Sequence, residues 1–283
     1  MIRSHHDEAE EEKHEKRKDA RRRASPSGKV VYAAILREAD EELERSNTEL
    51  LWSGLAAGLS MGFSAAAEAM LRAHLPDAPW RPLITKLGYS VGFLIVILGR
   101  QQLFTENTLT PVLPVLRRRD AKTLGNMLRL WAIVLVANLI GALAVAWLLA
   151  RTSALEPNVR EALVAIAREA TRHSFFVTLI KGIFAGWLIA LIVWVLPYAE
   201  TAHVWIILIL TYVVGLGQFS HIIAGAVEAF AGAWAGAVPW SNLPVGYILP
   251  TLLGNIIGGV TFVAALNHAQ VTHGAEDEEL EIA

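Results

Sequence analysis

The chain contains no cysteine among its 283 residues. Disulfide bonds, thiolate nucleophiles and cysteine-ligated metals are therefore excluded. A cofactor motif, a metal-binding cluster and a nucleophile constellation are also missing from the sequence, which argues against an enzyme. We expect no cofactor, no resident metal ion and no nucleic-acid partner.

Charge is scarce as well, and it is unevenly placed. Only 18% of the residues are charged, 54% are hydrophobic, and the mean hydropathy is +0.40. The charges gather outside several apolar runs that reach the roughly 20 residues needed to cross a bilayer core of about 30 Å. We therefore predict an all-α integral membrane protein with six transmembrane helices, at approximately 50–74, 84–116, 124–150, 174–197, 203–234 and 244–268.

The distribution of basic residues predicts the orientation of these helices. No apolar run precedes residue 50, so we expect no cleavable signal peptide and a first span that serves as the insertion signal. Lysine and arginine are dense before this span and in the loop after the second span, which carries Arg117, Arg118, Arg119 and Lys122. By the positive-inside rule, both termini lie in the cytoplasm. The 151–172 connection also contains arginines, but its glutamates favour an amphipathic helix at the opposite membrane face.

The patterns divide the chain into three segments. They are a charged cytoplasmic tail with an amphipathic helix (1–47), a six-span channel domain (48–270) and an acidic cytoplasmic tail (271–283). Three histidines of the first tail lack a fixed spacing and a thiolate partner, so solvated side chains are favoured over metal ligands. They are His5, His6 and His14.

Two polar stretches, at 103–108 and 217–221, interrupt the second and fifth apolar runs. Non-helical backbone is tolerated at membrane depth only where protein or a water-filled cavity satisfies its polar groups. An Asn-X-Ile-Gly tetrad follows each stretch, and 117 residues separate Asn138 from Asn255 as they separate Phe104 from His221. Such corresponding breaks predict two inverted three-helix repeats, with a transport site where they meet.

Other polar residues near the breaks are expected to support them. Asn138 and Asn255 should bind the backbone groups that the neighbouring break leaves free. Arg100, Glu106 and Glu228 would each cost about 2.5 to 3.5 kcal/mol at the bilayer centre. We therefore expect an ion pair between Arg100 and either Glu106 or Glu228, although an Arg100 that faced the pathway would instead attract anions.

His221 is the only histidine expected deep in the membrane. An ionisable group at that depth usually faces a cavity or a pathway, and a neutral imidazole can donate a hydrogen bond or a proton near neutral pH. The alternative is a histidine that bonds a backbone carbonyl for packing alone. Thr105 and Thr108 supply hydroxyls at the other break, and Phe104 supplies an apolar plug. The combination suits a narrow, mostly dry constriction.

Taken together, these residues resemble the formate/nitrite transporter family over about residues 48–270. Leu103-Phe104-Thr105 is similar to the family's Leu-Phe-Thr break, and Phe-Ser-His-Ile-Ile-Ala-Gly at 219–225 is similar to its Phe-Glu-His-Ser-Ile-Ala-Asn break. Pro244 and Gly-Asn-Ile-Ile-Gly-Gly at 254–259 match its last span. The resemblance implies an aquaporin-like, homopentameric channel for small monovalent anions in a bacterial inner membrane.

The resemblance also implies the residues of the pathway. Thr105 and His221 would form its central pair. The anion would meet a proton-donating or hydrogen-bonding His221 and cross as the neutral weak acid, which avoids most of the desolvation cost. One apolar constriction would be lined by Leu103, Phe104, Tyr89 and Phe93, and Val214 would fall near the other.

Three positions depart from the family pattern. Gly186 and Gly225 stand where the family usually has asparagine, and Ala170 stands where it often has lysine. Two other functional classes stay open beside anion transport. The same half-helix architecture would suit a channel for a neutral small solute, and a non-transporting membrane protein could use its charged tail to bind partners.

Overall fold

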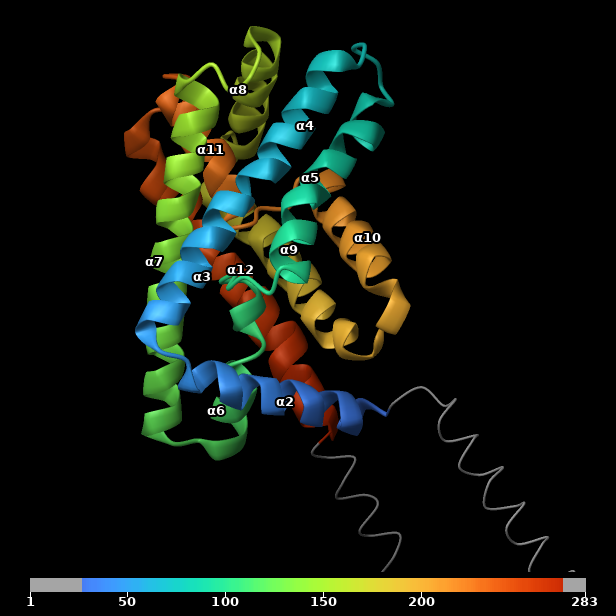
Figure 1. Cartoon of the computed structure of the whole chain (residues 1–283), viewed down its shortest axis with the longest axis vertical. Helices are drawn as coiled ribbons and strands as arrows, with labels where there is room; N and C mark the ends of the chain where they lie inside the picture. The colour runs from blue at the N-terminus through green and yellow to red at the C-terminus, as the bar shows by residue number, and fades with distance from the viewer. Residues whose placement is uncertain (1–26, 272–283) are drawn as a thin grey trace, which may run out of the picture.

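The computed structural model describes residues 27–271, and every regular element in this range is a helix (Figure 1). The predicted tail histidines and nearly all of the acidic segment 271–283 lie outside the described residues. The first element is α2 (Gly28–Glu44), where the sequence predicted an amphipathic helix. It crosses one end of the helix bundle, and α8 (Pro157–Thr171) lies at the opposite end (Figure 1).

The first half of the bundle contains the first three predicted spans. Ser46 and Glu49 form a capping box that starts the first span, and the Asp120 carboxylate accepts a hydrogen bond from the Thr123 amide over 2.9 Å to start the third. The second span stops at the predicted polar stretch. The elements are α3 (Asn47–Ser60) and α4 (Gly62–His74), α5 (Arg81–Leu98), η1 (Glu106–Thr108), α6 (Val112–Arg118) and α7 (Ala121–Arg151).

The second half repeats this order after α8. Its second span is again short, stops at a polar stretch and resumes as a separate helix. The elements are α9 (Phe175–Val195), η2 (Leu196–Tyr198), η3 (Glu200–Ala202), α10 (His203–Leu216), α11 (Ala224–Trp234), η4 (Trp240–Asn242), η5 (Pro244–Ile248), α12 (Leu249–Gly259) and η6 (Val260–Ala265).

Five segments are long and apolar enough to cross a membrane by length and composition. They are Asn47–His74, Arg81–Leu98, Ala121–Arg151, Phe175–Tyr198 and Trp240–Val271. The remaining predicted span consists of the shorter apolar helix α10, the break and α11. Both predicted breaks are therefore present in the structure, between α5 and α6 and between α10 and α11.

Glycine allows close helix packing at equivalent places in the two halves. A Cβ added to Gly58 of α3 would collide with the backbone of Asn138 on α7, and one added to Gly186 of α9 would collide with the backbone of Asn255 on α12. Small residues let helix backbones approach in this way within membranes. Gly186 is thus explained by the approach of α12, which leaves no room for a side chain.

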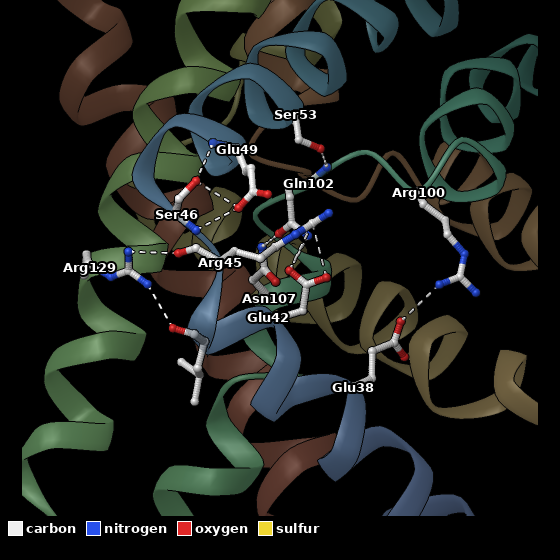
Figure 2. A network of polar contacts seen from close by, with 11 residues as sticks. Glu38, Glu42, Arg45, Ser46, Glu49, Ser53, Arg100, Gln102, Asn107 and Arg129 are labelled. Carbon is white, nitrogen blue, oxygen red and sulfur yellow. Dashed lines mark hydrogen bonds and ion pairs between the residues drawn. The ribbon is translucent and has the colours of Figure 1, made fainter.

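Polar contacts tie α2 to the first break (Figure 2). Gln102, which is 8% exposed, donates from Nε2 to a Glu42 carboxylate oxygen over 2.6 Å and accepts from Asn107 Nδ2 over 2.9 Å. The Gln102 amide donates to Ser53 Oγ over 3.0 Å. Burial raises the pKa of Glu42, although the neighbouring Arg45 opposes this shift. The amphipathic helix α2 and the first break therefore form one polar network.

Arg129 of α7 anchors the C-terminal end of α2 in the same network (Figure 2). Its guanidinium donates to the carbonyl oxygens of Leu43 and Arg45 over 2.9 and 3.1 Å, and to Asn47 Oδ1 over 2.6 Å. The last carbonyl groups of a helix lack partners within that helix, so an arginine placed there satisfies them.

Arg129→Ala is expected to loosen α2 while the transmembrane bundle stays folded. Hydrogen bonds to a charged group contribute about 1.5 kcal/mol or more, so local opening of α2 should increase about tenfold. Limited trypsin digestion of the purified protein would measure this as faster cleavage after Arg37 and Arg45. Arg151→Ala, at the other end of α7, is the matched control and should digest like wild type. Equal digestion of all three proteins would contradict the anchoring role.

Candidate functional site

The two breaks follow the same backbone course. Each starts with a residue in the left-handed region, because Arg100 and Gln218 both have a φ of 50°. In each break, the amide of the next residue donates to the carbonyl group five positions earlier, over 3.0 and 2.9 Å. Residues other than glycine rarely adopt this backbone conformation. The two turns are thus equivalent, and 118 residues separate them.

This equivalence corrects the predicted register of the repeat. The spacing of 117 residues holds for Asn138 and Asn255, but the breaks themselves are offset by 118. Phe104 therefore corresponds to Ile222, and Leu103 corresponds to His221. Sequence spacing alone pairs Phe104 with His221, because the loop between break and tetrad is one residue longer in the first half. The side chains at equivalent positions are consequently unlike.

Asn255 of α12 binds three backbone groups around the second break. Its Oδ1 accepts from the Ile222 amide over 2.8 Å, and its Nδ2 donates to the carbonyl oxygens of Gly182 and Ser220, each over 2.8 Å. Asn255 is fully buried. One side chain thereby joins α9, α12 and the break, and it satisfies polar groups that have no helical partner.

Asn138 of α7 makes the same three contacts around the first break. Its Oδ1 accepts from the Phe104 amide over 2.9 Å. Its Nδ2 donates to the Gly54 carbonyl oxygen over 2.7 Å and to the Gln102 carbonyl oxygen over 2.9 Å. Both breaks are therefore held in the same manner, by an asparagine from the third helix of their own half.

Thr105 and His221 meet where the two breaks approach each other. Thr105 Oγ1 lies 2.8 Å from His221 Nε2, and both residues are buried, at 0% and 1% exposure. His221 Nδ1 accepts from the amides of Ile223 and Ala224 over 3.2 and 3.1 Å. Because Nδ1 faces two N–H groups, the imidazole is neutral with its proton on Nε2, which donates to Thr105.

The same contacts satisfy two backbone amides at the start of α11, whose first residue is Ala224. The side chain of a residue just before a helix commonly accepts from the first free amides of that helix. His221 does so with a ring nitrogen, and the other ring nitrogen is left for the contact with Thr105. The Thr108 hydroxyl stabilises the first break itself, because its Oγ1 donates to the Thr105 carbonyl oxygen over 2.7 Å.

Aromatic rings surround the imidazole on one side. The Phe93 ring meets it edge-on, with centroids 4.9 Å apart and planes at 81°, and the Tyr89 ring lies 5.3 Å from Phe93. The Phe104 ring instead contacts Trp131 of α7, at 5.6 Å. Leu103, which is fully buried, belongs to the same apolar core. The wall beside His221 is thus formed by Phe93 and Tyr89 of α5.

A cavity of about 40 Å³ reaches His221 from the end of the bundle that carries α8. This α8-side cavity is lined by residues that include Lys86, Tyr89, Val214, His221, Glu228 and Tyr247. Its volume suits a molecule of a few heavy atoms. Tyr89 and Val214 border the same cavity, whereas the sequence assigned them to different constrictions. The two side chains come together because the end of α10 packs directly against Tyr89.

The ion pair expected of Arg100 is also wrong. Its guanidinium lies 3.8 Å from Glu38 of α2, and its side chain is 88% exposed (Figure 2). The left-handed turn at Arg100 directs the side chain toward α2 and away from Glu106 and Glu228. Glu106 is partly buried in η1, and Glu228 of α11 is 7% exposed. Neither carboxyl makes an ion pair with any residue between 27 and 271.

Two ion pairs beside the cavity were missed by sequence reasoning. Glu68 of α4 is 1% exposed and pairs with Lys86 of α5, and Arg72 pairs with Glu169 of α8 over 2.7 Å. The sequence did contain a signal for the first pair, because Glu68 and Lys86 carry opposite charges near the ends of two consecutive apolar runs. Glu68 is buried because α8 folds back over this end of α4.

Lys181 of α9 donates to the carbonyl oxygens of Gly217 and Gln218, over 3.4 and 3.2 Å. These carbonyl groups end α10, where a cation is favourable. No group of three histidine, aspartate or glutamate side chains in the described part of the chain lies close enough to hold a metal ion.

Gly225 has no side chain because Tyr247 occupies the space beside it. A Cβ at residue 225 would collide with the Tyr247 ring and hydroxyl, and Tyr247 is 3% exposed. Gly225→Ala should therefore destabilise the assembled protein by about 1–3 kcal/mol through overpacking. The change is measurable as a lower midpoint in thermal unfolding of the purified protein.

Two further variants define the cause of this loss. In the double variant with Gly225→Ala and Tyr247→Ala, the two losses of stability should be less than additive, because the colliding ring is removed. Gly246→Ala is the control, since a Cβ there meets no atom within 4 Å. A double variant less stable than the sum of its single changes would show that Tyr247 is not the obstacle.

The sequence of the chain is similar to those of known proteins. The family model described as formate/nitrite transporter matches residues 29–269. The chain is 37% identical over 275 residues to the inner membrane protein YfdC of Escherichia coli strain K12, which covers 95% of this chain and 89% of that protein. It is 26% identical over 243 residues to the formate channel BtFdhC of Bacillus thuringiensis, covering 82% and 91%.

Solved structures share the arrangement of helices. A pentameric formate channel with formate bound superposes with a TM-score of 0.68 at 22% identity, covering 78% of this chain and 95% of that chain. An FNT family ion channel superposes with a TM-score of 0.72 at 20% identity, covering 83% and 96%. These likenesses confirm the predicted aquaporin-like fold of two repeats with a broken helix in each.

Proposed function

Because this chain belongs to the formate/nitrite transporter family, we propose that it carries small monovalent anions, or their conjugate weak acids, through a pathway centred on His221. The observation that carries the proposal is the contact of Thr105 with His221. It lies where the two breaks meet, and the α8-side cavity opens onto it. Relatives of the same family include proteins named as formate channels.

In this proposal, His221 acts as a hydrogen-bond donor. Its Nδ1 is held by the amides of Ile223 and Ala224, so a second proton on that nitrogen would face two N–H groups. Its Nε2–H, which donates to Thr105 in the structure, is the group that would donate to an anion in place of Thr105. A hydrogen bond from a fixed, buried donor partly replaces the water that the anion loses.

Beyond the donor, the wall of Phe93 and Tyr89 disfavours a charge. An isolated ion in an apolar passage pays a large desolvation cost, whereas the neutral acid pays little. We propose that the substrate crosses this part of the pathway uncharged. Asn138 and Asn255 serve the pathway indirectly, by holding the breaks that carry Thr105 and His221 in register.

The same family membership leads us to propose the setting of the protein. We infer a homopentamer in a bacterial inner membrane, with α2 on the cytoplasmic side and the α8-side cavity toward the outside. The basic residues at the end of α6, on the same side of the bundle as α2, support this orientation. Because the substrate would cross the membrane without a change in its covalent structure, apart from its proton, we infer a channel or transporter and not an enzyme.

Flux measurements in proteoliposomes test the proposal. Formate, nitrite, hydrosulfide, acetate and lactate should be compared at several pH values, with glycerol and water as neutral solutes. Uptake of at least one of the anions, faster at lower pH, is expected. Movement of glycerol or water alone would favour a neutral-solute channel, and an assembled protein that moves none of these would overturn the transport proposal.

A further inference from the structure

We propose that Glu228 is the proton-donating residue of the α8-side cavity, where it converts an incoming weak-acid anion into the neutral acid. This inference rests on the proposed transport function and adds to it the source of the proton. It begins from the arrangement of His221, whose single ring proton is on Nε2 and whose Nδ1 is closed by two amides. A neutral imidazole in that arrangement can hold an anion, but it has no spare proton to give.

Two carboxyl groups line the cavity, and they differ in their surroundings. Glu169 pairs with Arg72 over 2.7 Å, and its side chain is 33% exposed. Glu228 is 7% exposed and makes no hydrogen bond or ion pair with any residue that the structure describes. A buried polar group without a protein partner is uncommon in a native structure. Glu228 therefore has its oxygens available for a molecule in the cavity.

The charges around Glu228 are already matched to one another. Lys86, which lines the cavity, pairs with the buried Glu68, and Arg72 pairs with Glu169. Lys181 is directed to the carbonyl oxygens that end α10. Glu228 is thus the acidic group of this cavity without an ion-pair partner, because Lys86, the cation among the lining residues, is already paired with Glu68.

The remaining titratable groups that line the cavity are two tyrosines and two histidines. Tyr89, Tyr247, His173 and His221 line the cavity with it. An ionised Glu228 would repel an entering anion, and it would pay the desolvation cost of a buried, unpaired charge. A protonated Glu228 instead presents an O–H donor to the anion in the cavity that His221 also lines.

The proposed step is balanced as a single proton transfer. The O–H bond of the Glu228 carboxyl breaks, a new O–H bond forms on the substrate anion, and the carboxylate stays behind in the cavity. A proton from water at the open end of the cavity then restores the carboxyl group. One proton accompanies each anion, and the chemistry is general acid catalysis by a positioned carboxyl.

Glu228→Gln tests this step, because the amide keeps the shape and loses the transferable proton. Formate uptake into proteoliposomes should fall about 100-fold at pH 7.5. At pH 4.5, where formic acid itself is abundant in solution, the difference should shrink to about twofold, since the substrate then arrives with its own proton. Glu228→Asp keeps the acid and should retain the wild-type pH profile at a lower rate. Glu161→Gln, on the exposed face of α8, is the matched control.

A measurement on the unaltered protein covers the case in which Glu228→Gln fails to assemble. A hydrophobic carbodiimide reacts with protonated carboxyl groups in apolar sites, and mass spectrometry would locate the adduct. Glu228 should be modified, faster at low pH, and formate should slow the reaction.

The outcomes separate the two proposals. Wild-type protein that carries no anion would overturn the transport function and this inference together. Wild-type flux with a Glu228→Gln loss that is equal at every pH, or with no loss at all, would overturn the inference and leave the transport function standing. An unreactive Glu228 in the carbodiimide experiment would also count against it.

Discussion

His221→Phe is expected to reduce formate uptake by a factor of about 100 or more at pH 7 and to lower the stability of the protein as well. The transport loss follows because the Nε2–H is the buried donor at the meeting point of the breaks, and one such donor is typically worth about 100-fold or more. The stability loss follows because phenylalanine leaves the amides of Ile223 and Ala224 without an acceptor. Each unpaired buried amide costs about 1–3 kcal/mol.

His221→Asn separates these two effects. An asparagine oxygen can still accept from the amides of Ile223 and Ala224, because asparagine side chains commonly accept from backbone amides a few residues on. It is too short to reach Thr105. We therefore expect His221→Asn to unfold close to the wild-type temperature and yet to lose formate uptake as His221→Phe does.

The measurements are initial uptake rates in proteoliposomes and thermal unfolding of the same preparations. His74→Phe, at the exposed end of α4, is the control and should change neither quantity. Retention of formate uptake by both His221 variants would refute the central role of the imidazole. Glycerol permeation through His221→Phe without formate uptake would show that the variant still forms an open, neutral pore.

Asn255→Leu is expected to prevent stable assembly of the protein. Leucine has nearly the same shape but leaves three buried backbone groups without a partner, at Ile222, Gly182 and Ser220. At about 1–3 kcal/mol for each group, the loss is comparable with the entire stability of an average domain, about 5–15 kcal/mol. The measurement is the yield of assembled protein on size-exclusion chromatography after solubilisation.

Asn138→Leu should have an effect of the same size, since Asn138 makes the same three contacts at the first break. The control is Asn267→Leu, which removes a single contact to the Val263 carbonyl oxygen at the partly buried end of the last span. If Asn255→Leu and Asn267→Leu gave equal yields of assembled protein, the breaks would have to be held by other contacts.

Local features of the chain were sufficient to predict the elements of this fold. Apolar runs of membrane length predict spans, and polar stretches such as 103–108 predict where a span is interrupted, because both depend on residues close together in sequence. Asn138 and Asn255 were recognisable for the same reason. Their partners could be inferred as well, since a buried amide beside a broken helix has few other groups to bind.

Contacts between distant segments could not be predicted in this way. Arg100 pairs with Glu38 because a left-handed turn reverses its direction, and that turn is invisible in residue types. The burial of Glu68 depends on α8 folding back over α4. A shift of one residue in the repeat exchanged Phe104 for Leu103 as the counterpart of His221.

The sequence by itself determined that this chain is a helical membrane protein with two broken spans and a histidine in one of them. Hydropathy and helix interruption are sufficient for this, because each span must satisfy its own backbone in lipid. Only the tertiary structure decided what His221 and Glu228 can do. The two amides on Nδ1 make the imidazole a donor, and the pairing of Lys86 with Glu68 leaves Glu228 as the unpaired acid in the cavity. Those properties depend on which groups face each other across the bundle, and only packing brings such groups together.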